Sequence, residues 1–360
     1  MASDLFIGTL LESEDAAPAH LIAAKLNRHT FWCGQSGSGK TYALGVLLEQ
    51  VLLHTRLPMV ILDPNSDFAR LNETRANADP VLAAELATRD IRVFGQTSGK
   101  PIKARYVDLQ LRSRAAIINI DPVLDAEDYN IMLRLEEEIR QIDEGHLIQY
   151  LRGSEDPARR RLAMRLENLG VADWGLWAWG GRSVTDEIDE KPDATVVDLG
   201  GFDTAAESRA AALTILDHLW DRREDRVGRL IVIDEAHNLC PPNPSTPTEV
   251  LLAERIVQIA AEGRKYGLWL LLSTQRPSKV HPNALSQCYN LALMRMSSAR
   301  DLAELEEVFG YAPASLVHRS PDFLQGQALF AGGFVETPSL FQMGARLTVE
   351  GGSDVVVPLR

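Results

Sequence analysis

The chain has 360 residues, of which 45% are hydrophobic and 24% are charged. These are ordinary proportions for a globular protein, and they exclude disordered, collagen-like and low-complexity classes. The 37 Lys and Arg residues against 50 Asp and Glu residues give a net charge of -13, so no global basic field would attract the chain to DNA or to an anionic membrane.

Cysteine usage and hydropathy indicate where the protein functions. Cys33, Cys240 and Cys288 are far apart and form neither a CxxC pair nor a Cys/His metal pattern, which is typical of a reduced, cytoplasmic protein. The N-terminal segment lacks a basic region, and no apolar run approaches the roughly 18 residues that a membrane span needs. We therefore expect no contact with a membrane.

From Thr30 onward, short β-rich runs alternate with helical patterns. This alternation predicts an α/β fold, a mostly parallel sheet flanked by helices. The expected strands are Thr30–Cys33, Met59–Leu62, Ile91–Phe94, Thr195–Leu199, Leu230–Ile233, Leu268–Leu272, Leu291–Met294 and Ala328–Ala331. Between the first two, Leu44, Leu47, Leu48 and Val51 have the spacing of an amphipathic helix.

Residues 113–185 interrupt this rhythm and read mainly as helix. They contain an acidic run from Asp125 to Glu144, which we interpret as a solvated helix face, and a basic cluster at Arg159, Arg160, Arg161 and Arg165. After residue 331 the chain alternates like a β segment with Gly and Pro punctuation, and we expect an extended tail.

The phosphate-binding motif stands between the first expected strand and the amphipathic helix. It reads Gly34-Gln35-Ser36-Gly37-Ser38-Gly39-Lys40-Thr41 and matches the pattern G-x-x-x-x-G-K-[ST]. Glycines allow the backbone N–H groups to wrap phosphates, while the helix N-terminus faces the anion. We expect Lys40 to reach the β- and γ-phosphates of ATP and Thr41 to bind Mg²⁺.

A pair of carboxylates follows a later buried strand. Because Leu230–Ile233 is apolar, Asp234 should lie at the carboxyl edge of the sheet beside the P-loop, where it can hold Mg²⁺. We expect Glu235, one residue further, to point the other way and to polarise an attacking water. The pair favours hydrolysis of the nucleotide over simple binding.

A polar side chain at the tip of the next strand can sense the γ-phosphate. The strand Leu268–Leu272 runs into Ser273-Thr274-Gln275, and Gln275 is our sensor candidate. The alternative is a polar strand end without a role in catalysis.

Several strings outside these motifs match a known family. They are Arg28-His29, Asp63-Pro64-Asn65-Ser66-Asp67-Phe68, Val197-Asp198-Leu199, Gly263-Arg264-Lys265-Tyr266-Gly267, Thr274-Gln275-Arg276-Pro277-Ser278 and Gly326-Gln327-Ala328-Leu329. From about residue 20 onward the chain resembles the HerA branch of the HerA/FtsK-type ATPases. The resemblance implies a RecA-like P-loop core and a homo-hexameric ring that uses ATP to move double-stranded DNA through its centre.

The chain departs from the family pattern at two places. HerA proteins usually carry an N-terminal β-barrel that docks a nuclease, whereas only about 27 residues precede Arg28 here, so we expect the barrel to be missing or reduced to a strand. This puts the usual nuclease partner in question. In addition, Ser66 stands where the family usually has Gly.

The motifs and the resemblance together predict five segments. These are a short N-terminal segment at 1–27, a first core part at 28–112, the helical insertion at 113–185, a second core part at 186–331 and a C-terminal tail at 332–360.

Ring ATPases of this kind complete each site with an arginine from the neighbouring subunit, because charge accumulates on the transferred phosphoryl group. By resemblance, Arg264 is the best candidate for this trans arginine and Arg28 the second. Arg276 and Arg295 are weaker candidates. For each of them the alternative is an ordinary surface arginine.

Contact with DNA would require a local basic patch. Lys100, Lys103 and Arg105 form one candidate together with Arg112 and Arg114, and six copies of it around a pore would give a positive track. The Arg159–Arg165 cluster is the other candidate, although it could instead pair with the acidic run of the same insertion.

The sequence thus predicts a hexameric ATPase that translocates DNA. One alternative is a ring-shaped scaffold that regulates a partner nuclease or another effector with little translocation of its own. A second alternative is a secretion-type ATPase that drives protein transport or conjugation.

Overall fold

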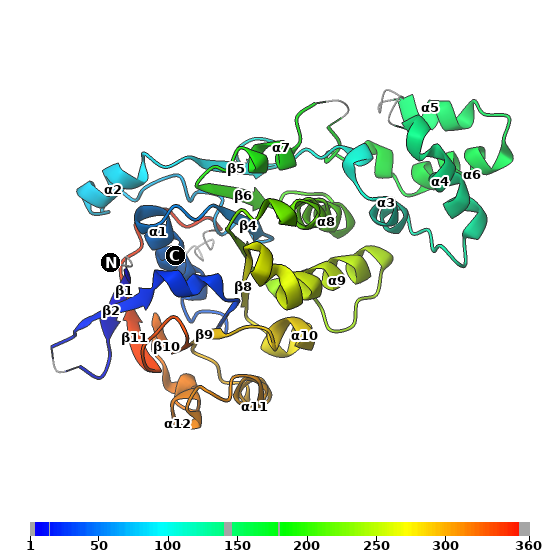
Figure 1. The fold of residues 1–360 in the computed structure, drawn as a ribbon. Helices are drawn as coiled ribbons and strands as arrows, with labels where there is room; N and C mark the ends of the chain where they lie inside the picture. The colour runs from blue at the N-terminus through cyan, green and yellow to red at the C-terminus, as the bar shows by residue number, and fades with distance from the viewer. Residues whose placement is uncertain (1–3, 14, 140–145, 179–180, 353–360) are drawn as a thin grey trace, which may run out of the picture.

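The computed structural model describes residues 4–13, 15–139, 146–178 and 181–352 (Figure 1). They form an 11-stranded sheet in the order β2-β1-β11-β10-β9-β3-β8-β7-β4-β6-β5. Its strands are β1 (Asp4–Leu10), β2 (Pro18–Ile22), β3 (Thr30–Cys33), β4 (Met59–Asp63), β5 (Ile91–Gly95), β6 (Ala194–Asp198), β7 (Arg229–Ile233), β8 (Leu268–Thr274), β9 (Asn290–Met294), β10 (Gln327–Gly332) and β11 (Ser339–Met343). The expected α/β class and all of the expected strands are confirmed.

The sheet has a parallel and an antiparallel part. From β9 through β3, β8, β7, β4 and β6 to β5 the paired strands are parallel, with Thr30 opposite Leu271 and Val60 opposite Ile231. The strands β10, β11, β1 and β2 extend the β9 edge in antiparallel pairs. The N-terminal segment therefore continues the central sheet as two strands, and the segment after residue 332 contributes β11.

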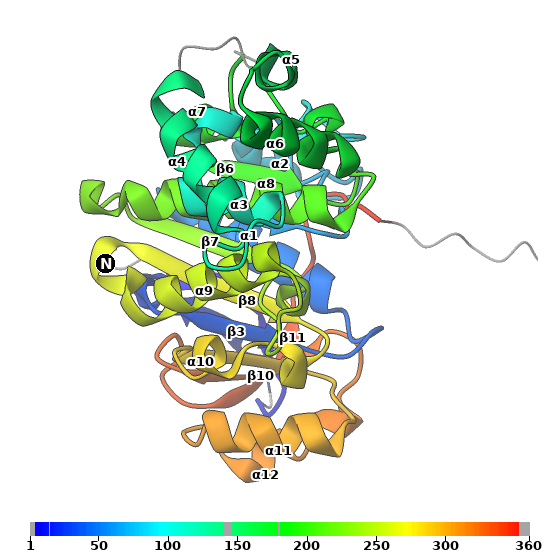
Figure 2. The ribbon, with the colours of Figure 1, turned by 90° about the vertical axis from the view of Figure 1, so that its right-hand side faces the viewer.

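Helices cover both faces of the sheet (Figures 1 and 2). The α-helices of the described residues are α1 (Lys40–His54), α2 (Pro80–Leu86), α3 (Leu111–Ile117), α4 (Ala126–Ile139), α5 (Leu147–Arg152), α6 (Pro157–Asn168), α7 (Val184–Asp189), α8 (Ala205–Asp221), α9 (Pro247–Glu262), α10 (Pro282–Leu285), α11 (Ala299–Val308) and α12 (Ala314–Val317). α1 and α2 pack on one face, and α8, α9 and α10 on the other.

Alternation along the central strands supplies both hydrophobic cores. In β4, Val60 and Leu62 join the core under α8 and α9, while Met59 and Ile61 join the core under α1. Every residue of this strand is buried, as expected for a parallel strand covered by helices on both faces. The sheet is therefore a rigid support for the loops at its carboxyl edge.

Between β5 and β6, the helices α3 to α6 form a lobe that projects beyond α8 and α9 (Figure 1). Its acidic and basic runs pair with each other: Arg159 contacts Glu138, Arg161 contacts Glu127, and Arg165 contacts Asp128. The basic cluster thus pairs with the acidic run, which was one of its two interpretations. The end of the acidic run, at residues 140–145, lies outside the described residues. We keep the five-segment division of the chain as a proposal.

Candidate nucleotide-binding site

The P-loop connects β3 to α1 at the carboxyl edge of the sheet. Gly39 is the N-cap of α1 in the left-handed region, with φ of 85°, and a Cβ there would come within 3.3 Å of the backbone N of Gly326. At Gly34, a Cβ would come within 2.7 Å of both Met294 Cβ and Ser38 Oγ. Gly39 is therefore required for its backbone conformation, and Gly34 for its close packing.

Lys40 is held between the P-loop and the carboxylates. Its Nζ donates to Asp234 Oδ1 and to Ser273 Oγ, each at 2.8 Å, and lies 3.3 Å from Glu235 Oε1. Burial disfavours the ammonium, but the two carboxylates outweigh it and raise the pKa of Lys40 above its ordinary value. Lys40 therefore stays cationic at the point where β7 and β8 end.

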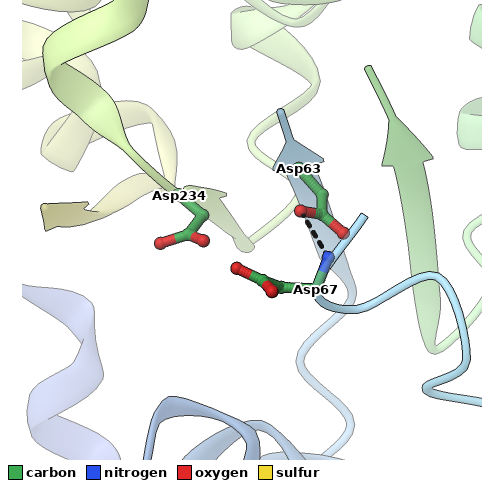
Figure 3. Close-up of side chains that lie close together, drawn as sticks. All are labelled: Asp63, Asp67 and Asp234. Atoms are coloured by element: carbon green, nitrogen blue, oxygen red, sulfur yellow. Dashed lines mark hydrogen bonds between the residues drawn. The ribbon is translucent and has the colours of Figure 1, made fainter. Parts of the chain in front are cut away.

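The carboxylates of three aspartates lie close together near Lys40 (Figure 3). One carboxylate oxygen from each of Asp63, Asp67 and Asp234 lies within 4.8 Å of the others. Oδ2 of Asp234 is buried and has no hydrogen-bond partner among the described residues. Asp67 is also 3.4 Å from the hydroxyl of Thr41, which donates to it. The cluster offers oxygen ligands of the kind that Mg²⁺ prefers.

Asp63 orders the loop that carries Asp67. Its carboxylate accepts the backbone N–H groups of Asp67 at 3.0 Å and of Phe68 at 2.7 Å. Burial and the neighbouring aspartates raise the pKa of Asp63 to about 8, although these hydrogen bonds oppose the rise. For Asp67, burial and the charge of Asp234 raise the pKa to about 6, against the charge of Lys40. Positive charge beyond Lys40 would thus stabilise this cluster.

Ser66 departs from the family pattern without loss of the turn. Its φ is 63°, in the left-handed region where Gly is favoured. The Ser66 hydroxyl donates to Asp198 Oδ1 at 2.7 Å, a bond that glycine could not form. This hydrogen bond helps to offset the strained backbone of a non-glycine residue.

Glu235 faces Lys40, so the expectation that it points away from Asp234 is wrong. Strand β7 ends at Ile233, and Glu235 has φ of 43°, which turns its side chain back toward the P-loop. Gln275 Nε2 donates to Glu235 Oε1 at 2.8 Å. The structure thus brings together the predicted base and the predicted sensor.

His237 fixes the other oxygen of Glu235. Its Nδ1 lies 3.2 Å from Glu235 Oε2 and 3.0 Å from Thr274 Oγ1. Burial raises the pKa of Glu235, but His237, the charge of Lys40 and Gln275 together lower it to about 2. Glu235 is therefore a carboxylate at physiological pH. Sequence reasoning assigned no role to His237, Ser273 or Asp67, although Asp67 stands in a family string.

The two arginine candidates lie at the opposite edge of the sheet. Arg28 precedes β3, and Arg264 lies in a 3₁₀ turn (Gly263–Tyr266) that precedes β8. Burial lowers the pKa of His29, and the charges of Arg264 and Arg28, which lie near its ring, lower this pKa further. A strand the length of β8 spans roughly 20 Å, so neither arginine reaches the P-loop of its own chain.

The weaker candidates lie at the P-loop edge instead. Arg276 follows β8 and is exposed. Nη2 of Arg295 donates to the carbonyl of Gly37 at 3.0 Å, so this arginine lies on the P-loop of its own chain.

The proposed DNA contacts at Lys103 and Arg105 are engaged within the chain. Arg105 pairs with Asp186 and Asp108, each at 2.6 Å, and Lys103 donates to the carbonyl of Gly175 at 2.6 Å. Of the remaining members, Arg112 pairs with Glu254 and Arg114 is buried. Lys100 is exposed and lies over the Phe94 ring. The structure therefore does not present these residues as one free basic track.

The chain matches the family described as "Helicase HerA, central domain" over residues 5–219. It belongs to this HerA family. The HerA-type chain is 29% identical to the "Probable DNA double-strand break repair helicase HerA" of Methanocaldococcus jannaschii over 35% of its own length and 24% of that protein. It is 21% identical to the "DNA double-strand break repair helicase HerA" of Pyrococcus furiosus, covering 94% of this chain and 69% of that protein.

Solved structures share the fold of this HerA-type chain. VirB4 of Thermoanaerobacter pseudethanolicus superposes with a TM-score of 0.64 at 16% identity, covering 96% of this chain and 97% of that one. The plasmid coupling protein TrwB in complex with the GTP analogue GDPNP gives a TM-score of 0.58 at 14% identity, covering 96% and 95%. Among the described residues, no helix is long and apolar enough to cross a membrane.

Proposed function

We propose that this protein is an ATP-hydrolysing motor that assembles as a homo-hexamer and couples hydrolysis to the translocation of double-stranded DNA. The observation that carries the proposal is the convergence of Lys40, Glu235 and Gln275 at one edge of the sheet. Membership of the HerA family supports ATP as the substrate, and the names of the HerA relatives, which are DNA repair helicases, support DNA.

The residues present fit a magnesium ion. Asp234 has a buried, unpartnered oxygen, Asp67 adds a second carboxylate, and the Thr41 hydroxyl is next to Asp67. Asp63 is less suited, because its oxygens already accept backbone N–H groups. Asp67, Asp234 and Thr41 would hold Mg²⁺, directly or through its waters, and the ion would neutralise charge on the phosphates.

The chain's own groups account for binding and activation. The P-loop N–H groups and the α1 N-terminus bind the phosphates, and Lys40 neutralises their charge. Glu235 is ionised and is oriented by Gln275 and His237, so it can accept a proton from an attacking water. Gln275 can report the γ-phosphate because it contacts this base.

Arg264 and Arg28 are our candidates for completing the neighbour's site. They lie at the sheet edge opposite the P-loop, so each subunit of a head-to-tail ring would bring its arginines toward the P-loop edge of the next one. Arg264 is exposed and forms no ion pair with a described residue, whereas Arg28 donates to its neighbour Asn27. Arg264 therefore remains the first candidate.

Only part of the proposed DNA contact remains. We keep Lys100 as a candidate because its ammonium is exposed. We withdraw Arg105, because transferring it to a phosphate would break its ion pairs with Asp108 and Asp186.

A Glu235→Gln substitution tests the hydrolytic assignment. Glutamine retains the size and the contact with Gln275 but cannot accept the proton, so we expect ATP binding to persist while turnover falls by about 10²- to 10⁴-fold. ATP binding by calorimetry and phosphate release measure the two effects. Glu127→Gln, which changes a carboxylate on the exposed face of α4, is the matched control and should hydrolyse ATP like the wild type. Retained turnover in Glu235→Gln would refute the role of this residue.

Stimulation by DNA separates the motor from a regulatory ring. At low salt, we expect duplex DNA to increase the rate of ATP hydrolysis and a Lys100→Ala variant to respond more weakly. If duplex DNA has no effect while a partner nuclease stimulates hydrolysis, the regulatory function replaces the motor.

A further inference from the structure

A polar cavity of about 770 Å³ extends from the P-loop to residues near the C-terminus. Lys40, Thr41 and Gln275 lie at one end of it. Gln35, Ser36, Gly37, Gly39, Tyr42, Asn65 and Asp67 also line the cavity. The remaining lining residues come from the turn before β10, from the end of β11 and from the chain that follows; they are Gln325, Gly326, Gln342, Met343, Gly344, Ala345, Glu350 and Gly352. Apart from Gly326, which stands in one of the family strings, none of the motifs discussed above includes residues of this second end.

The antiparallel pairing of β10 and β11 places this second end beside the P-loop. β10 starts at Gln327 and β11 ends at Met343, so the chain just before one and just after the other meet at the same sheet edge. The N–H of Gly326 donates to the carbonyl of Ser38 at 3.0 Å, and the N–H of Met343 donates to the carbonyl of Gly326 at 2.9 Å. The backbone of this second end is thus hydrogen-bonded to the P-loop itself.

The chain after β11 is anchored to α1. The carboxylate of Glu49 accepts the N–H groups of Leu347 and Thr348, each at 2.8 Å. The fully buried guanidinium of Arg346 lies 3.7 Å from Glu49, and the N–H of Arg346 donates to the Tyr42 hydroxyl at 2.7 Å. The N–H of Gly351 then reaches the carbonyl of Asp67 at 3.1 Å. These bonds make the segment a fixed wall of the cavity.

We propose that this wall binds the ribose and base of the nucleotide whose phosphates occupy the P-loop. The inference rests on the proposed function, which places a nucleoside triphosphate here. The phosphates take the Lys40 end, and the nucleoside then needs a neighbouring polar space. Gln325 and Gln342 offer amides that both donate and accept, while Gly344 and Ala345 leave room for a flat ring. The side-chain amide of Gln342 lies beside Gly326, where a Cβ would come within 2.8 Å of its Nε2.

Binding of ATP and of inorganic tripolyphosphate, compared by calorimetry, tests the wall separately from the P-loop. Ala345→Trp fills the second end from an exposed position, so we expect ATP to bind at least tenfold more weakly and tripolyphosphate to bind as in the wild type. Gln342→Ala should weaken ATP in the same selective way but less. Ala314→Trp, at an exposed position of α12 outside the cavity, is the matched control for bulk and should leave both affinities unchanged.

The outcomes distinguish the two proposals. If Ala345→Trp and Gln342→Ala bind ATP as the wild type does, or lose ATP and tripolyphosphate equally, the nucleoside wall is refuted while the P-loop assignment stands. If Lys40→Ala leaves the binding of both probes unchanged, the proposed function itself fails.

Discussion

At the scale of single residues, His29 shows how burial and charge act on one side chain. Burial, with the nearby charges of Arg264 and Arg28, lowers the pKa of this imidazole to about 4. Its Nδ1 accepts the N–H of Leu270 at 2.9 Å, which requires the neutral ring. In the unfolded chain a histidine titrates near pH 6.5. As the pH falls from 6.5 to 4, the unfolded state therefore binds a proton that the folded state does not bind.

We therefore predict that the protein loses stability in acid. The contribution of His29 to the free energy of unfolding is fully present above about pH 6.5, and roughly 3 kcal/mol of it is lost by pH 4. Urea unfolding at pH 7 and at pH 4.5 measures it. We expect the free energy of unfolding to fall less between these values in His29→Gln than in the wild type. His20→Gln, an exposed position on β2, is the control and should follow the wild type. An equal fall in His29→Gln and wild type would contradict the assignment.

Sequence and structure agree at the motif residues and differ where a turn decides the direction of a side chain. The strand and helix predicted on either side of the P-loop are present as β3 and α1, and they place Lys40 at the start of the helix. For Glu235, strand alternation was the wrong rule, because the strand had already ended and the residue turns at a positive φ. Asp67 lies far from Asp234 in the sequence, and only the pairing of β4 with β7 brings their carboxylates together.

At the scale of elements, α1 is a support for both ends of the candidate site. Its first residue is Lys40. Further along the same helix, Glu49 anchors the chain that follows β11. Glu49 is almost fully buried, and burial raises its pKa although three hydrogen bonds and the charge of Arg346 oppose the rise. A substitution of Glu49 should therefore affect both α1 and the chain that follows β11.

We predict that Glu49→Ala destabilises the protein by about 3 to 5 kcal/mol, because it removes one of the two carboxylates beside the buried Arg346 and the acceptor of two buried N–H groups. Hydrogen exchange should speed up at the amides of Leu347 and Thr348, which lose their acceptor. Glu85→Ala on α2 is the control: Glu85 is exposed and pairs with Arg89 just after this helix, so the change should cost less than about 1 kcal/mol. Unchanged exchange at both amides in a folded Glu49→Ala protein would exclude the anchoring role.

The parallel strands and β10 were predictable, whereas β1, β2 and β11 were not. Each central strand is a short apolar run, since it is buried on both faces. β1, β2 and β11, which extend the sheet beyond β10, carry no such run, because each of them is only partly buried. Their place in the sheet depends on pairing between the N-terminal segment and the chain after residue 332, which no local pattern indicates.

At the scale of the whole molecule, the two ends of the parallel strands have different charge and chemistry. The P-loop edge carries Lys40 among carboxylates, and the other edge carries Arg28 and Arg264 around His29. Two such edges complement each other only in a head-to-tail contact, which closes into a ring when the rotation allows. The net charge of -13 is compatible with the proposed ring, because an acidic exterior would keep rings apart while the arginines would face the next subunit.

Mixed rings test this arrangement directly. Lys40→Ala subunits lack a working P-loop but keep Arg264, and Arg264→Ala subunits have the reverse defect, so each pure ring should be inactive. In a random equal mixture, about one quarter of the head-to-tail interfaces join an intact P-loop to an intact arginine, and we expect hydrolysis per site to recover to that fraction. Mass measurement must first show mixed hexamers.

Rings carrying Lys40→Ala and Arg264→Ala in the same chain supply the control and should stay inactive at every ratio. If assembled mixed rings recover no activity, Arg264 does not act across the interface, and the same mixture with Arg28→Ala then decides whether the second candidate does.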